Sequence, residues 1–171
     1  MSSEYAVDNK LNEGHNIFMT LSELLKPELL LIKAPCDSKD DLIAKLVEKI
    51  CNSEKDFLQS QNDLLELIYK REHIGGTLLP SGLSVPHARL GNMEGFVFAM
   101  GTSSKPMFHE GLKLRLMVVM ISSQTGVPYY LPTVAALTKL SRDGDYFSRL
   151  CDAEDSDEFI KILKEKDQVV G

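Results

Sequence analysis

The sequence lacks the cysteine and histidine spacings that build disulfide frameworks or zinc sites. Its three cysteines, Cys36, Cys51 and Cys151, are an odd number and form no Cys-x-x-Cys pair. Disulfide frameworks use even numbers of cysteines, and zinc sites use closely spaced pairs. No two histidines have His-x-His or His-x-x-x-His spacing. We therefore expect neither a disulfide framework nor a metal site.

Long hydrophobic runs are also missing. The longest uninterrupted apolar run is Leu116 to Ile121, whereas a membrane helix requires about 20 residues. The segment Met1 to Lys10 carries Glu4 and Asp8, and no apolar stretch with a small-residue cleavage site follows it, so it does not read as a secretory signal. These absences predict a protein without a membrane span, and we expect it in the cytoplasm.

The chain has fewer basic than acidic residues. The chain has 19 Lys and Arg against 25 Asp and Glu, a net charge of -6 and a pI of about 5.2. Nucleic-acid binding needs a clustered basic surface, so we expect no nucleic-acid partner. The length of 171 residues fits one ordinary domain. Residues 1–19 show no sustained hydrophobic period and predict a flexible extension, which leaves 20–171 as a single domain.

Hydrophobic periodicity predicts helices in the first third of the chain. Thr20-Leu-Ser-Glu23 has the form of a capping box. Ser38 to Asp41 again resembles a helix start, and an apolar stripe at the spacing of one helical face follows it. A second amphipathic helix is expected from about Ser60 to Gly75-Gly76.

The pattern then changes to short strand-like segments. They are residues 83–86, 95–102 and 114–122, with an earlier candidate strand at 29–32. After Pro128 we expect a helix with Pro132 in its first turn and with Leu131, Val134, Ala135, Leu137 and Leu140 on one face. Short helices fit residues 146–151 and 156–165. This order predicts an α/β fold in which a small mixed β-sheet is flanked by helices.

Residues 71–89, between the second helix and the sheet, carry the chemistry. They read Arg-Glu-His-Ile-Gly-Gly-Thr-Leu-Leu-Pro-Ser-Gly-Leu-Ser-Val-Pro-His-Ala-Arg. His87 follows the rigid Pro86, and an imidazole at a strand end is a candidate nucleophile or general base because it is mostly neutral at pH 7. Arg71 and Arg89 can grip an anion through charge-assisted hydrogen bonds.

This stretch resembles the signature of enzyme IIA domains of the mannitol/fructose class of the phosphoenolpyruvate-dependent sugar phosphotransferase system. That signature has an Arg-Glu pair, a loop with Thr and Gly, and a Pro-His-Ala-Arg ending. The matching residues here are Arg71, Glu72, Gly75, Thr77, Gly82, Pro86, His87, Ala88 and Arg89. The similarity extends over about residues 20–165, through Leu24-Leu25, Leu31, Ser38-Lys39, Phe57, the strand at 117–121 and the helix at 131–140. With no transporter span or second domain attached, the likeness is closest to the stand-alone nitrogen-type regulatory enzymes IIA.

The resemblance implies a phosphoryl relay that needs neither a metal nor a cofactor. In that family the histidine matching His87 receives a phosphoryl group from the histidine-containing phosphocarrier protein. It passes the group to a IIB domain or keeps it as a regulatory mark, with a transporter or a sensor kinase as the regulated partner. Arg71 and Arg89 are then expected to hold the phosphoryl oxygens, with a hydrogen bond from Thr77. We expect regulation rather than sugar transport.

Two departures from the family pattern concern the site. The family loop commonly reads Gly-Ser-Thr-Gly-Ile-Gly, whereas Leu78 and Pro80 here stand where glycines are expected, which predicts a stiffer loop. The family's second histidine, at the start of the later helix, is matched by Tyr130. A phenol donates a hydrogen bond but supplies no positive charge at neutral pH. His109, before the strand at 114–122, is a second candidate for supporting the site.

These departures leave another interpretation open. The chain could be a binding module that keeps the enzyme IIA fold, has lost phosphotransfer and regulates a partner by contact alone. The intact Arg71, Thr77 and Pro86-His87-Ala-Arg89 favour the carrier. A hydrolase that uses His87 as a base ranks below both, because no Gly-x-Ser-x-Gly or similar nucleophile context is present.

Overall fold

The computed structural model describes residues 19–54, 60–91, 93, 95–124 and 127–170. Most of the predicted extension, with His15, lies outside these residues, and so does Phe57. In chain order the elements are β1 (Met19–Thr20), α2 (Leu21–Leu24), a 3-10 helix (Pro27–Leu29), β2 (Leu30–Ala34), α3 (Lys39–Ser53), α4 (Gln61–Ile74), β3 (Leu83–Ser84), β4 (His87–Leu90), β5 (Phe96–Ser103), β6 (Met107–His109), β7 (Leu112–Leu114), β8 (Leu116–Ser123), α5 (Val127–Arg142), α6 (Gly144–Asp152), α7 (Ser156–Glu165) and β9 (Val169–Val170).

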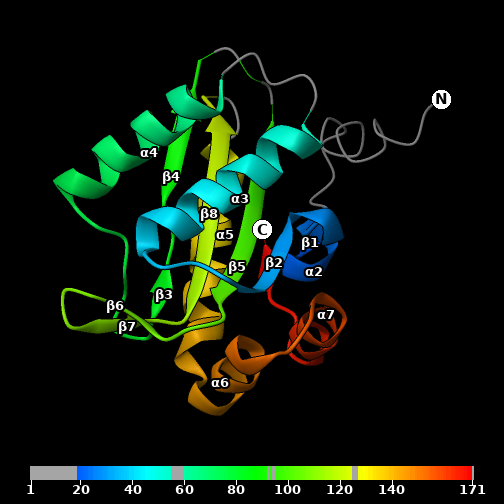
Figure 1. Ribbon diagram of the computed structural model, residues 1–171. Helices are drawn as coiled ribbons and strands as arrows, with labels where there is room; N and C mark the ends of the chain where they lie inside the picture. Colours follow the sequence, from blue (N-terminus) through cyan, green and yellow to red (C-terminus); the bar gives the residue numbers. More distant parts are fainter. Residues whose placement is uncertain (1–18, 55–59, 92, 94, 125–126, 171) are drawn as a thin grey trace.

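A mixed β-sheet lies at the centre of the molecule (Figure 1). Its order is β2-β5-β8, and both β3 and β4 pair with the other edge of β8. The pairing of β5 with β8 is antiparallel, and the remaining pairs are parallel. The prediction of a small mixed sheet flanked by helices is confirmed.

Helices cover both faces of this sheet. Helices α3 and α4 lie over one face and α5 over the other, with α6 and α7 beyond the lower end of α5 (Figure 1). The central strand β8 is buried throughout. It contributes side chains to the hydrophobic cores on both faces of the sheet, because successive side chains of a strand point to opposite faces. Val118 and Met120 join the core under α5, and Val119 and Ile121 join the core under α3 and α4.

The edge formed by β3 and β4 is a strand interrupted at Val85-Pro86. Proline has no N–H to donate, so in sheets it is found at edges and irregularities. The carbonyl of Pro86 still accepts a hydrogen bond from the N–H of Met120 (2.9 Å), and His87 then pairs with Met120 at the start of β4. The sequence pattern placed His87 at a strand end but did not predict the strand that it begins.

The early helices form where the sequence predicts them. The side chains of Ser38 and Ser60 cap α3 and α4 by accepting from the N–H groups of Asp41 and Asp63, which supplies partners for otherwise unpaired helix donors. The capping box of Thr20 and its helix α2 are also present. The apolar stripes of α3 and α4 bury their hydrophobic side chains against the sheet.

Helix α5 differs from the prediction at its beginning. It begins at Val127, so Pro132 lies inside the helix and not in its first turn. Val134, Leu137 and Leu140 pack in the core as predicted, whereas Leu131, which is 64% exposed, and Ala135 do not. The buried stripe of the helix runs through Tyr130, Thr133, Leu137 and Leu140, at the spacing of one helical face. The proline leaves one carbonyl of the first turn without its helical hydrogen bond, and a helix end tolerates this better than a helix interior.

Two short antiparallel pairs lie outside the main sheet. Strand β1 pairs with β9, which joins the two ends of the described chain, and β6 pairs with β7 in a hairpin near β3 (Figure 1). Strands of two or three residues are too short to show a hydrophobic period, so the sequence did not predict them. Within the described ranges, no helix has the length and apolar character needed to cross a membrane.

Candidate functional site

His87 lies on the edge strand β4, and its side chain points toward α5. Ala88 and Leu90 point into the core under α3 and α4, so His87 and Arg89 point to the opposite face of the sheet. There Tyr130, from the first turn of α5, meets both side chains. Its ring lies 4.8 Å from the imidazole centroid, and the guanidinium carbon of Arg89 lies 5.6 Å from the centroid of the Tyr130 ring.

The Tyr130 hydroxyl lies over the face of the imidazole. Its oxygen is 3.3 Å from Nδ1 and 3.4 Å from Nε2 of His87. An oxygen nearly equidistant from both nitrogens and in the ring plane would collide with the carbon between them. The oxygen therefore lies above the ring, and the in-plane directions of both nitrogens are free of it. Nδ1 instead faces the backbone carbonyl of Val85 at 3.4 Å.

The surroundings of His87 favour the neutral imidazole. Burial lowers the pKa of His87 from its ordinary value, and the charges of Arg71 and Arg89 lower it further. The hydrogen bond to the Val85 carbonyl and the charge of Glu72 act in the opposite direction and are outweighed. A neutral imidazole retains a lone pair on one nitrogen, and a nucleophile needs that lone pair.

Arg71 acts on the same groups through its charge, from a different element. It lies in the last turn of α4, and its charge acts on both His87 and Tyr130. Burial raises the pKa of Tyr130, with Arg89 and Arg71 opposing the rise, so the phenol stays protonated and neutral near pH 7. The structure thus brings together His87, Arg71, Arg89 and Tyr130, as the sequence predicted.

Thr77 is hydrogen-bonded within a partly buried network. Its hydroxyl donates to Oε1 of Glu72 (3.0 Å) and accepts from the N–H of Val85 (3.1 Å). Since a hydroxyl has a single proton, Thr77 in this state has none left for a phosphoryl oxygen. Its expected hydrogen bond to a phosphoryl oxygen stays a prediction, and its observed contacts are with Glu72, Ser84 and Val85.

His109 lies in the β6–β7 hairpin and not in the His87 contacts. Its ring is paired with the adjacent Glu110 at 3.9 Å, and its side chain is exposed. Across the described ranges, no hydrogen bond or ring contact joins His109 to His87 or Tyr130. Its expected support of the site remains a prediction without a contact behind it.

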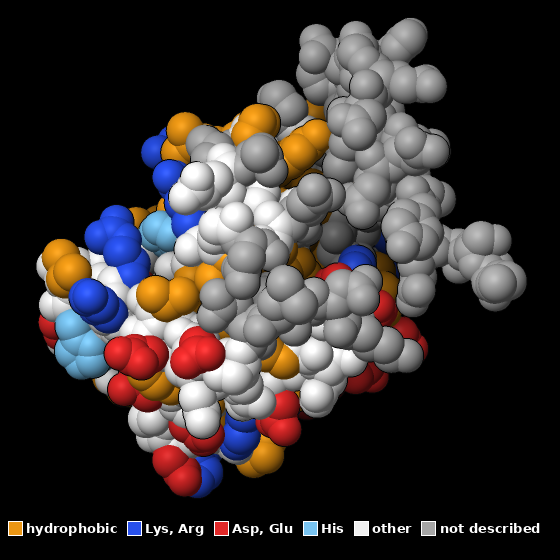
Figure 2. Space-filling model, turned by 90° about the horizontal axis from the view of Figure 1, so that it is seen from above, with side chains coloured by type: hydrophobic (Ala, Val, Ile, Leu, Met, Phe, Trp, Pro, Cys, Tyr) orange, Lys and Arg blue, Asp and Glu red, His pale blue; other side chains and the backbone are white. Residues whose placement is uncertain are grey.

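Two exposed cationic residues, Arg71 and Arg89, lie near His87, although the chain as a whole is acidic. Figure 2 shows one face of the molecule, on one side of which Lys and Arg side chains lie beside histidines. Two exposed apolar side chains adjoin the site in sequence: Ile74, which ends α4, is 75% exposed, and Leu131 follows Tyr130. Charge and exposed apolar surface together suit contact with another macromolecule.

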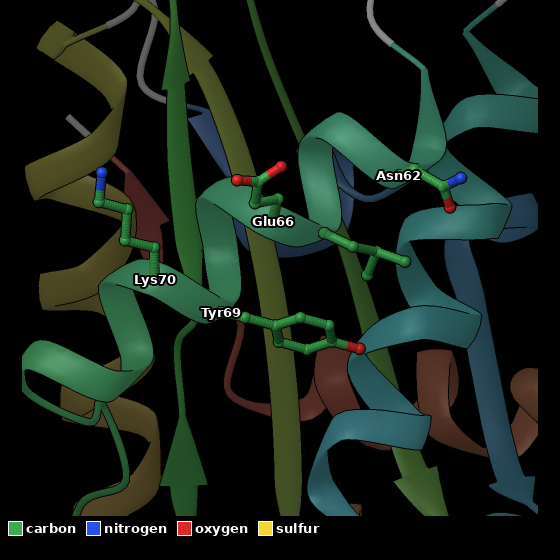
Figure 3. A pocket seen from close by; sticks show the side chains of 5 residues that line it. Asn62, Glu66, Tyr69 and Lys70 are labelled. Atoms are coloured by element: carbon green, nitrogen blue, oxygen red, sulfur yellow. The ribbon is translucent and has the colours of Figure 1, made fainter.

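A separate open pocket of about 630 Å³ lies on the outer side of α4. It is lined by Asn62, Leu65, Glu66, Tyr69 and Lys70. In Figure 3 Tyr69 points toward α3, where its hydroxyl donates to the carbonyl of Asp40 (3.0 Å). None of these residues belongs to the His87 site, so the pocket and the site are distinct.

Comparison with known protein families decides the identity of the fold. The family described as "Phosphoenolpyruvate-dependent sugar phosphotransferase system, EIIA 2" matches residues 23–166. The chain belongs to this enzyme IIA family. The match contains α3, α4, the central sheet and α5, together with His87, Arg71 and Arg89.

Two curated relatives illustrate the range of this enzyme IIA family. The 2-O-alpha-mannosyl-D-glycerate-specific EIIABC component of Escherichia coli is 27% identical over 161 residues, which cover 91% of this chain but only 24% of that protein. The nitrogen regulatory protein of Bradyrhizobium diazoefficiens is 23% identical over 150 residues, which cover 85% of this chain and 95% of the relative. The chain thus spans about a quarter of the first relative's length.

Solved enzyme IIA structures share the fold. Nitrogen regulatory protein IIA-Ntr from Neisseria meningitidis superposes with a TM-score of 0.69 at 20% identity, covering 83% of this chain and 97% of that one. The complex of Escherichia coli enzyme IIA mannitol with phosphorylated enzyme IIB mannitol gives a TM-score of 0.65 at 15% identity, covering 83% and 98%. At these identities the likeness concerns the fold alone.

Sequence reasoning about this enzyme IIA domain missed one part of the site's support. Lys39 and Glu72 form an ion pair of 2.6 Å with both side chains buried. Each residue continues the apolar stripe of its helix: Lys39 precedes Leu42 by three positions, and Glu72 follows Ile68 by four. Opposite charges on the buried stripes of two consecutive helices are the signal that could have predicted the pair.

Proposed function

We propose that this chain is a phosphoryl carrier that accepts a phosphoryl group on Nε2 of His87. The observation that carries the proposal is the state of the imidazole. Nδ1 faces a carbonyl oxygen, which requires the proton on that nitrogen, because two lone pairs would otherwise face each other. The lone pair is then on Nε2, and the low pKa keeps it available at neutral pH.

The transfer needs no proton movement at His87. The lone pair of Nε2 attacks the phosphorus in line with the bond to the donor, the new N–P bond forms and the donor's bond to phosphorus breaks. The electron pair of the broken bond stays on the donor's imidazole nitrogen. Charge is spread over the three oxygens of the moving group, so catalysis depends on positioning and on cationic groups.

Arg71 and Arg89 supply those cationic groups in the proposal. They approach the imidazole from α4 and β4, on two sides, and each presents a planar fork of donors that suits two phosphoryl oxygens. The pKa effect of both charges on His87 supports their closeness to the acceptor nitrogen. Tyr130 covers the imidazole face, excludes water from it and leaves Nε2 open in the ring plane.

The phosphoryl donor in this proposal is a histidine-containing phosphocarrier protein. The exposed Arg71 and Arg89, with the exposed Ile74 and Leu131, provide the contact surface in this proposal. The direct test is to mix the purified full chain with phosphoenolpyruvate, the first enzyme of the relay and the phosphocarrier. The protein is expected to gain about 80 Da, the mass of one phosphoryl group. The adduct should be labile in acid and stable in base, as a phosphohistidine is.

We further propose that the mark serves regulation of a transporter or a sensor kinase and not sugar transport. The likeness to nitrogen regulatory proteins, one 23% identical over 150 residues and one with a TM-score of 0.69, supports this choice. The test is to add purified IIB domains to the phosphorylated chain and to follow the phosphoryl group. A regulatory carrier keeps the group for minutes, whereas transfer to a IIB domain within seconds would assign the chain to transport.

The second candidate is a contact-only module, which Tyr130 favours because a neutral phenol replaces a group that can carry charge. Such a module binds its regulated partner equally well with and without the phosphorylating mixture. A full chain that stays folded by circular dichroism and gains no phosphoryl group would select this candidate over the carrier.

A further inference from the structure

The ion pair of Lys39 and Glu72 is buried behind the His87 loop. The side chains are 9% and 7% exposed, and Nζ lies 2.6 Å from Oε2. Lys39 opens α3 and Glu72 lies in the last turn of α4, next to Arg71. A buried ion pair contributes little net stability, because desolvation offsets the attraction. Stability alone therefore gives no reason for two charges at this place.

The second carboxylate oxygen of Glu72, Oε1, connects the ion pair to Thr77. Oε1 accepts the proton of the Thr77 hydroxyl (3.0 Å). With its proton committed to the carboxylate, the Thr77 oxygen can only accept, and it receives the N–H of Val85 (3.1 Å) and contacts the hydroxyl of Ser84 (3.2 Å). With the Thr77 proton on Glu72, the Ser84 hydroxyl is the donor in its contact with Thr77, so the direction of each hydrogen bond at the Thr77 hydroxyl is fixed.

Val85 connects this network to the acceptor histidine. Its N–H is held by Thr77, and its carbonyl faces Nδ1 of His87 at 3.4 Å. Holding the N–H fixes the peptide units around Val85, and with them the carbonyl that keeps the imidazole proton on Nδ1. The same carboxylate anchors the helical turn that carries Arg71.

We infer that Lys39, Glu72 and Thr77 are positioning residues that fix His87 as its Nδ1–H tautomer and so expose Nε2 as the phosphoryl acceptor. None of the three touches the phosphoryl group. Lys39 orients Glu72, Glu72 fixes the direction of the Thr77 hydroxyl, and Thr77 holds Val85. The consequence for the transfer rate rests on the proposed function, whereas the consequence for the tautomer does not.

The experiment compares Thr77→Val with Thr77→Ser in the full chain. Valine has nearly the shape of threonine but leaves the Val85 N–H and the Glu72 carboxylate without the hydroxyl, while serine keeps it. Nitrogen-15 NMR of the His87 ring distinguishes the two neutral tautomers. We expect a predominantly Nδ1–H ring in the wild type and in Thr77→Ser, and a mixture of tautomers in Thr77→Val.

Single-turnover phosphorylation gives the second readout. Misplacement of a reacting group commonly slows an enzymatic step by about 100-fold, so Thr77→Val is expected to be about 10- to 100-fold slower, with Thr77→Ser within about threefold of the wild type. Lys39→Met tests the far end of the network and should also mix the tautomers. If it does not fold, the two Thr77 variants decide the question.

The outcomes separate the two proposals. An unchanged Nδ1–H ring in a folded Thr77→Val overturns the positioning inference, whatever the rate. If Thr77→Val shifts the tautomer but the wild type takes up no phosphoryl group, the positioning inference is supported and the carrier function is overturned. A shifted tautomer with a slower transfer that serine rescues supports both.

Discussion

The phenol oxygen of Tyr130 lies over the imidazole face of His87, 3.3 Å from Nδ1 and 3.4 Å from Nε2. This contact buries one face of the ring and contributes to the desolvation that lowers the pKa of His87. It leaves the plane of the ring open, and an incoming phosphorus atom must approach in that plane. Tyr130 is therefore compatible with transfer but contributes no positive charge to it.

Replacing Tyr130 by an ionisable ring should quicken the transfer. Tyr130→His introduces an imidazole that can carry positive charge beside the phosphoryl oxygens, whereas loss of one preorganised donor commonly costs about 100- to 1,000-fold. We expect a rise of about tenfold in the single-turnover rate, measured by rapid quench. Tyr130→Phe, which keeps the ring, should stay within about threefold. A severalfold loss in Tyr130→Phe with no gain in Tyr130→His would mean that the phenol hydroxyl already acts as the donor.

The transfer rate should depend on pH through the free imidazole. Neutral His87 is the nucleophile, so the rate is full above its pKa and falls as the pH drops through it. Because burial, Arg71 and Arg89 lower that pKa, the acid limb lies below the ordinary value of about 6.5. Arg89→Gln removes one of the charges that lower the pKa of His87, so the acid limb of the rate profile should move to higher pH. The same substitution at the exposed Arg142 should leave the acid limb in place. A limb that stays in place in Arg89→Gln would remove Arg89 from the site.

Arg71 should be needed for its shape as well as its charge. Arg71→Lys keeps the charge and loses the planar fork that holds two oxygens. We expect a fall of about tenfold in the single-turnover rate, with circular dichroism and thermal unfolding unchanged. Arg142→Lys, the same substitution on an exposed part of α5, serves as the control. Equal rates for both variants would contradict the assignment.

Gly82 should tolerate no side chain. Its φ is +91°, and a Cβ there would lie 2.5 Å from Cγ of Arg115 and 2.7 Å from the carbonyl oxygen of Lys113. Gly82→Ala is therefore expected to lower the free energy of unfolding by about 1–3 kcal/mol, measured in urea. Gly144→Ala, where a Cβ meets nothing within 4 Å, is the control and should change it by less than about 0.5 kcal/mol. Similar effects at the two positions would refute this explanation.

The sequence predicts the parts of the fold that repeat a strong pattern. Helices α3 and α4 have long apolar stripes and serine caps, and both were predicted nearly to the residue. The grouping of His87 with Arg89 also follows from sequence, because residues two apart in a strand share a face. Placing Tyr130 beside them depended on the resemblance to the enzyme IIA family.

Other features depend on contacts that the sequence pattern does not contain. Strand β4 has four residues and follows a proline, so its strand character comes from pairing with β8. Leu131 is exposed because the buried stripe of α5 runs through Tyr130, Thr133, Leu137 and Leu140 and leaves Leu131 outside it. The proton of Thr77 goes to Glu72 only because Lys39, 33 residues from Glu72 in sequence, holds that carboxylate in place.

The central claim is that His87 is the phosphoryl acceptor. Its most direct test is mass spectrometry of single histidine variants after incubation with phosphoenolpyruvate, the first enzyme of the relay and the phosphocarrier. Wild type, His15→Ala, His73→Ala and His109→Ala are expected to gain about 80 Da, and His87→Ala is expected to gain nothing. A phosphoryl group that still appears on His87→Ala, or a wild-type chain that gains none, would contradict the account.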